Sequence, residues 1–154
     1  CSSLVEIPSS IGKLQKLEWL DMGYCVKLQV VPNRFNLTSL ESVNMLGCWR
    51  MRKFPDISTN ITYLSVADTM LQDLPESVNL WSRLRSLVID GGLKTMSKQK
   101  FRDRSGKDIE RIPDWIKDLR GLQELQIVSC PKLVILPELP LSLRRLLVKT
   151  CESL

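Results

Sequence analysis

The sequence predicts an α/β solenoid, a fold in which short coils stack on one another, from two recurring patterns. The first pattern is Leu-x-x-Leu-x-Leu, in which Ile, Val or Met replaces some leucines. Its six copies are LEWLDM (17–22), LESVNM (40–45), ITYLSV (61–66), LRSLVI (84–89), LQELQI (122–127) and LRRLLV (143–148). Their first residues lie 23, 21, 23, 38 and 21 positions apart. A period of roughly 20–29 residues is the signature of leucine-rich repeats.

The second pattern is a proline that closes the units. The proline-ended segments are LVEIP (4–8), LQVVP (28–32), MRKFP (51–55), LQDLP (71–75), IERIP (109–113) and LVILP (133–137). Because proline has no amide hydrogen to donate, it ends strand pairing at that point. We therefore expect each coil to contain one strand, a turn and a return segment on the opposite side.

Six strands are expected, one for each copy of the leucine pattern. Their predicted ranges are 18–22, 41–45, 62–66, 85–89, 123–127 and 144–148. No single unit can bury its own leucines, so consecutive units must stack. Their strands then form a curved parallel sheet on the concave side of a right-handed leucine-rich-repeat solenoid.

The segments that follow the prolines form the convex side. PSSIGKLQKL (8–17) and PDWIKDLRGL (113–122) place apolar residues three apart and therefore predict short helical turns. The shorter segments 55–61 and 137–143 predict extended arcs without helix. Trp81 and Trp115 lie in convex segments, where we expect both rings to be part of the core.

The whole chain, residues 1–154, is predicted to be one leucine-rich-repeat region of about six repeats preceded by a partial one. Residues 93–108 interrupt the period, either as a basic surface loop or as a decayed repeat. Residues 92–108 hold six Lys or Arg and two Asp, and so carry most of the net charge of +5. Because the rest of the chain is nearly neutral, a broad nucleic-acid-binding face is not expected.

Several chemical functions lack the residues that they require. The chain contains no histidine, which is the commonest general base and a common metal ligand. It has no glycine-rich phosphate loop and no motif that pairs a nucleophile with a base. We therefore expect no enzymatic activity, no cofactor and no metal. No apolar stretch is long enough to predict a membrane span.

The five cysteines share one position, immediately after the turn that follows the strand. They are Cys1, Cys25, Cys48, Cys130 and Cys151, with Thr69 and Gly92 at the same position in the other two units. A row of single side chains along a solenoid does not converge on a tetrahedral zinc ion. Disulfides between neighbouring units would leave an odd cysteine. We expect small, buried, reduced thiols that support the turn.

The concave face is the predicted partner-binding surface, because the third and fifth residues of each copy of the leucine pattern point out of it. Exposed aromatic residues often anchor interfaces, although Tyr63 could simply cover its neighbours and Trp49 could pack within its loop. The candidate contact residues are Trp19, Asp21, Asn44, Trp49, Tyr63, Ser65, Glu124, Gln126 and Arg145. The rival contact is the basic stretch, represented by Lys98, Lys100, Arg102 and Arg104.

The units ESVNMLGCWRMRKFPDISTNI (41–61) and DIERIPDWIKDL (108–119) resemble a known repeat region. Such units occur in plant intracellular disease resistance proteins of the Toll/interleukin-receptor, nucleotide-binding, leucine-rich-repeat class. The resemblance covers essentially the whole chain, with 93–108 as the departure, and residues 138–154 look like the last repeat before a post-repeat domain.

The resemblance implies a function in innate immunity. The repeats would recognise a pathogen effector or a guarded host protein and would help to hold the receptor inactive through its other domains. The implied location is the cytoplasm or the nucleus. The alternatives are a substrate-binding adaptor of a ubiquitin ligase and a secreted repeat protein.

Overall fold

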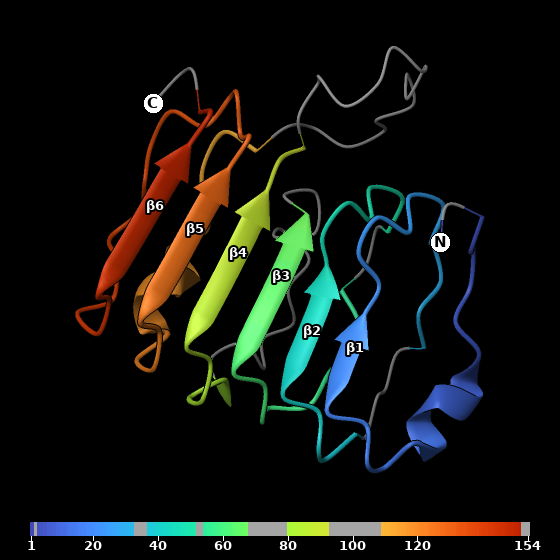
Figure 1. The fold of residues 1–154 in the computed structure, drawn as a ribbon. Helices are drawn as coiled ribbons and strands as arrows, with labels where there is room; N and C mark the ends of the chain where they lie inside the picture. Colours follow the sequence, from blue (N-terminus) through green and yellow to red (C-terminus); the bar gives the residue numbers. More distant parts are fainter. Residues whose placement is uncertain (2, 33–36, 52–53, 68–79, 93–108, 152–154) are drawn as a thin grey trace.

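The computed structural model describes all residues except 2, 33–36, 52–53, 68–79, 93–108 and 152–154. In the described residues, a single parallel sheet forms one side of the molecule. The strands are β1 (Trp19–Asp21), β2 (Ser42–Met45), β3 (Tyr63–Ala67), β4 (Ser86–Asp90), β5 (Glu124–Val128) and β6 (Arg145–Lys149). Each strand pairs in parallel with the next one along the chain, in the order β1 to β6 (Figure 1). This arrangement of stacked coils confirms the leucine-rich-repeat solenoid.

The register of the sheet places equivalent residues of successive units side by side. The fourth residues of the pattern form one continuous row: Leu20, Val43, Leu64, Leu87, Leu125 and Leu146. The middle four are fully buried, whereas Leu20 is half-buried and Leu146 is 43% exposed. Leu20 and Leu146 lie on the outermost strands, each of which pairs with a neighbour on one side only, and their burial is correspondingly lower.

All six strands begin one residue later than predicted, and the last four also end one residue later. The reason is visible in the backbone hydrogen bonds. The N–H of Arg85 donates to the carbonyl of Thr62 at 2.8 Å, so this residue is already tied to the preceding coil. The continuous ladder begins only at the next residue, Ser86. The predicted alternation of inward and outward residues is unaffected.

The convex side is a mixture of short helices and extended chain, as predicted. The 3₁₀ helices η1 (Ser9–Lys13) and η4 (Asp114–Asp118) each follow a proline in extended conformation. Residues 54–61 and 137–143 contain turns and no helix. The return segments are also tied together, because Glu6 bridges Val30 and Arg111 bridges Ile135 in parallel.

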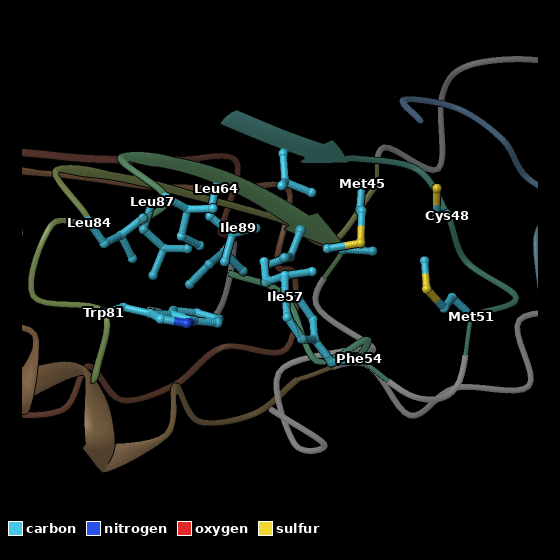
Figure 2. Close-up of a cluster of buried hydrophobic side chains, with 14 of the residues drawn as sticks. Met45, Cys48, Met51, Phe54, Ile57, Leu64, Trp81, Leu84, Leu87 and Ile89 are labelled. Atoms are coloured by element: carbon cyan, nitrogen blue, oxygen red, sulfur yellow. The ribbon is translucent and has the colours of Figure 1, made fainter. Parts of the chain in front are cut away.

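The core fills the space between the sheet and the convex arcs (Figure 2). Trp81 is 1% exposed, and its ring centroid lies 5.7 Å from that of Phe54 at an interplanar angle of 51°. Trp81 is therefore a core residue, as predicted. Trp115 is only half-buried and packs against the edge of the core, so the prediction for this ring was too strong.

The chain leaves β4 through a pair of glycines. A Cβ at Gly91 would collide with the backbone carbonyl of Ser129 in the next coil, and Gly92 has a φ of 74°. The close approach at Gly91 requires glycine, because a side chain there would clash. The left-handed backbone at Gly92 favours glycine, because other residues are strained in it. β4 pairs directly with β5. Residues 93–108 lie outside the described residues, so the choice between a loop and a decayed repeat stays a prediction.

Candidate recognition surface

Two rows of side chains make up the concave face. The third residues of the pattern form the first row: Trp19, Ser42, Tyr63, Ser86, Glu124 and Arg145. The fifth residues form the second row: Asp21, Asn44, Ser65, Val88, Gln126 and Leu147. Neighbouring strands lie about 4.8 Å apart, so the sheet brings together residues that are far apart in the sequence.

Trp19 is the most exposed aromatic side chain of the described residues, with 75% of its surface accessible. Its neighbour on β2 is Ser42, which is too short to cover the indole ring. Tyr63 follows on β3 and is half-buried. The structure therefore brings both predicted aromatic residues into one row, but only Trp19 stands free of its neighbours.

Asp21 and Asn44 have a structural role that the sequence analysis did not anticipate. One carboxylate oxygen of Asp21 accepts hydrogen bonds from the backbone N–H of Gly23 at 2.8 Å and from the Asn44 amide at 2.9 Å. The Asn44 carbonyl oxygen accepts the backbone N–H of Leu46 at 3.1 Å. Each side chain thus closes the turn that follows its own strand, and the pair ties the first two coils together.

The prediction that Ser65 is exposed on the concave face is wrong. Its side chain belongs to the outward row, yet the residue is only 2% exposed. Ser65 lies between Asn44 and Val88 on the neighbouring strands, and both of these side chains are larger. A short side chain between taller neighbours loses its accessible surface, so Ser65 has little area to offer a partner.

A second polar network lies at the other end of the concave face. The carboxylate of Glu124 accepts a hydrogen bond from the Gln126 amide at 3.0 Å and forms an ion pair with Arg145 at 3.3 Å. Arg145 is 74% exposed and Glu124 is 28% exposed at the side chain. The arginine therefore remains accessible, while the glutamate mainly positions its two neighbours.

Trp49 is half-buried and packs against the core, so part of its ring is already covered and its role as a partner contact stays a prediction. The rival contact residues Lys98, Lys100, Arg102 and Arg104 lie outside the described residues. The basic stretch therefore stays a prediction.

Tyr24 is an exposed aromatic residue that the sequence analysis missed. It is 61% exposed, has a φ of 57° and rests on Gly47 of the next coil. Three residues at the same position in other units are also left-handed, with φ of 70° at Gly47, 56° at Ser129 and 57° at Thr150. An aromatic residue in place of these small ones, directly before the cysteine position, was the available signal.

The cysteine row supports the turns from inside. Cys25, Cys48 and Cys130 are buried, whereas Cys1 is exposed and Cys151 is half-buried, so burial was predicted correctly for three of the five. All five positions are described, and none forms a disulfide. The Cys48 thiol donates a hydrogen bond to the carbonyl of Met22 at 3.1 Å. Burial, with a smaller contribution from nearby Cys25, raises the pKa of Cys48 to about 12, so this thiol remains neutral and unreactive near neutral pH.

The described part of the chain contains no group of three or more Cys, Asp or Glu side chains that could hold a metal ion. Within the same residues, no helix is both long and apolar enough to cross a membrane. The parallel sheet presents a solvent-facing surface of mixed polar and aromatic character. A sheet of this kind on stacked coils defines a leucine-rich-repeat scaffold.

Comparison with known proteins identifies the group of repeats. No family model matches the chain. Disease resistance protein RML1A of Arabidopsis thaliana is 42% identical over an alignment that covers 100% of this chain and 16% of the relative. Disease resistance proteins RPS6 and RPP5 of the same plant are 37% and 42% identical, over 89% and 68% of this chain and 13% and 7% of their own lengths.

These matches confirm the resemblance: the chain belongs to the leucine-rich-repeat regions of plant disease resistance proteins of the Toll/interleukin-receptor, nucleotide-binding class. The chain spans about a sixth or less of the length of these relatives.

Proposed function

We propose that the chain is a non-enzymatic protein-recognition region of a plant immune receptor, located in the cytoplasm or the nucleus. The partner is a pathogen effector or a guarded host protein, and contacts with other domains of the same receptor help to keep it inactive. Similarity to disease resistance proteins favours this function over a ubiquitin-ligase adaptor or a secreted repeat protein.

The exposure of Trp19 is the observation that carries the proposal. Its indole ring stands 75% exposed in a row of the concave face, next to a serine. Isolated exposed rings are costly to leave in water and contribute strongly to binding when a partner covers them, by about 2 kcal/mol or more at a hot spot. Tyr63 and the accessible Arg145 extend the contact along the sheet.

The test compares variants of a receptor that carries these repeats. Trp19→Ala should change partner binding or resting cell-death activity at unchanged protein level, because its side chain supports no core contact. Leu64→Ala, which removes a fully buried side chain, should instead lower the protein level. Leu141→Ala is the matched control, since it removes a fully exposed apolar side chain from the convex segment.

Two results would contradict the assignment of the concave face. One is a Trp19→Ala receptor with unchanged binding and unchanged resting activity. The other is loss of recognition on neutralising Lys98, Lys100, Arg102 and Arg104, while Trp19→Ala has no effect. The second result would assign recognition to the basic stretch.

A further inference from the structure

A cleft of about 440 Å³ lies along the side of the sheet at which the strands begin, next to the N-terminal ends of β2 to β5. This is the end opposite the arrowheads in Figure 1. Its lining includes Glu41, Thr62, Ser82, Arg83, Arg85 and Gln123. We refer to it as the edge cleft. It is separate from the two rows of the concave face, because none of its lining residues belongs to those rows.

The edge cleft is built by the stacking of the coils. Four of its residues are the second residues of successive leucine patterns, and backbone hydrogen bonds fix their order. The N–H of Thr62 donates to the Glu41 carbonyl at 2.7 Å, that of Arg85 to Thr62 at 2.8 Å, and that of Gln123 to Arg85 at 2.9 Å. These side chains are therefore held on a rigid backbone rather than on a loose loop.

The charged groups of the edge cleft lack partners within the described residues. Neither guanidinium, of Arg83 or of Arg85, forms an ion pair or hydrogen bond with a described residue, and the same holds for the Glu41 carboxylate. Thr62 separates Glu41 from Arg85 along the edge, so the acidic and basic walls lie two strand spacings apart, roughly 10 Å.

The chemistry of the lining limits what can bind. None of the lining side chains is apolar, whereas pockets for small organic ligands are predominantly hydrophobic. Two arginines favour a carboxylate, because each planar guanidinium can donate two parallel hydrogen bonds to it. Glu41 at the opposite wall repels a uniformly negative chain such as a nucleic-acid backbone, and attracts a cationic group instead.

We propose that the edge cleft binds a protein segment that carries one carboxylate side chain against Arg83 and Arg85 and one basic side chain near Glu41. The inference rests on the proposed function only in taking the partner to be a protein. It adds a second contact at the edge of the recognition surface. This contact selects partners by the order of the charged residues along their chain rather than by their apolar area.

The test is a titration of the isotopically labelled chain with two short peptides, followed by amide chemical shifts. The probe is acetyl-Gly-Asp-Gly-Gly-Lys-Gly-amide, and its control has Asn in place of Asp. The probe should shift the amides of Thr62, Ser82 and Gln123 in a saturable and salt-sensitive manner, and the Asn peptide should shift them much less.

Three variants test the charge assignment. Arg85→Gln should weaken probe binding about two- to fivefold, the range for an exposed ion pair. Arg144→Gln, the same residue type at the same position of another coil but outside the cleft, should have little effect. Glu41→Gln should strengthen binding of a purely acidic peptide in which Gly replaces Lys, a gain that general damage to the fold would not produce.

Equal shifts with the Asn peptide, or equal weakening by Arg144→Gln and Arg85→Gln, would overturn the proposal. Inorganic phosphate displacing the probe at equal concentration, with no response to Glu41→Gln, would also overturn it and indicate a general anion site. Trp19→Ala should leave the probe shifts unchanged. A failure of the edge cleft is therefore distinguishable from a failure of the concave-face assignment.

Discussion

Stability should follow the burial of the leucine row, and Leu64 is the position at which this can be worked out most directly. Leu64 is fully buried, and both of its neighbours in the row, Val43 and Leu87, are fully buried as well. Leu64→Ala removes three carbons, a transfer free energy of about 2.4 kcal/mol at roughly 0.8 kcal/mol per carbon. Because the enclosed site cannot collapse fully, a cavity term raises the expected loss of unfolding free energy to about 3–5 kcal/mol.

The same substitution at the outer strands should cost less. Leu146 is 43% exposed, so part of its side chain already contacts water and no closed cavity forms. Leu146→Ala should lower the unfolding free energy by about 1–1.5 kcal/mol. Leu20, which is half-buried, should give an intermediate value.

Urea unfolding followed by circular dichroism and by tryptophan fluorescence would measure the three losses. Both signals must give the same midpoint, since stacked coils can lose cooperativity and unfold in parts. Comparable losses at Leu64, Leu20 and Leu146 would refute the argument, because the cost would then not depend on burial. A larger loss at Leu146 than at Leu64 would refute it more strongly.

Two further predictions concern close contacts between coils. Gly121→Ala should destabilise the chain by more than about 1 kcal/mol, because a Cβ there would collide with the Ser82 carbonyl. A Cβ at Gly12 would have nothing within 4 Å, so Gly12→Ala should be neutral or slightly stabilising. Equal melting temperatures for both variants would contradict the contact at Gly121. Burial raises the pKa of Cys48 from 9.0 to about 12. The neutral thiol therefore stabilises the folded state fully below pH 9, and this stabilisation is lost between about pH 9 and 12, because the thiol of the unfolded chain ionises first. The unfolding free energy should therefore fall with pH in this window by up to about 1.4 kcal/mol per unit more than in Cys48→Ala, and parallel pH profiles of the two proteins in urea titrations would contradict the assignment.

The repeat pattern predicted the sheet well because its physical cause is local. Inward leucines at fixed spacing require one strand orientation, so the row that holds Leu20 and Leu64 follows from the sequence. The burial of Ser65 could not be predicted, since it depends on the heights of Asn44 and Val88 in other coils.

The candidate site was predictable in position but not in detail. The row that holds Trp19 and Tyr63 follows from the register, whereas the bond between Asp21 and Asn44 depends on rotamers that no spacing reveals. The edge cleft could not be found from the sequence, because it arises only when consecutive coils stack at a definite distance.

The position of Tyr24 against Gly47 has a consequence for how such repeats can be exchanged. A Cβ at Gly47 would lie 2.8 Å from a ring carbon of Tyr24, and the left-handed backbone at Gly47 already disfavours a side chain. A replacement coil with Ser or Thr at that position, as in the units of Ser129 and Thr150, would force the tyrosine ring to turn away. The coils of this chain are therefore not freely exchangeable. Duplication or recombination of one coil changes the orientation of exposed side chains on the coil before it. A new binding surface can arise in this way without a substitution of any residue that faces the partner.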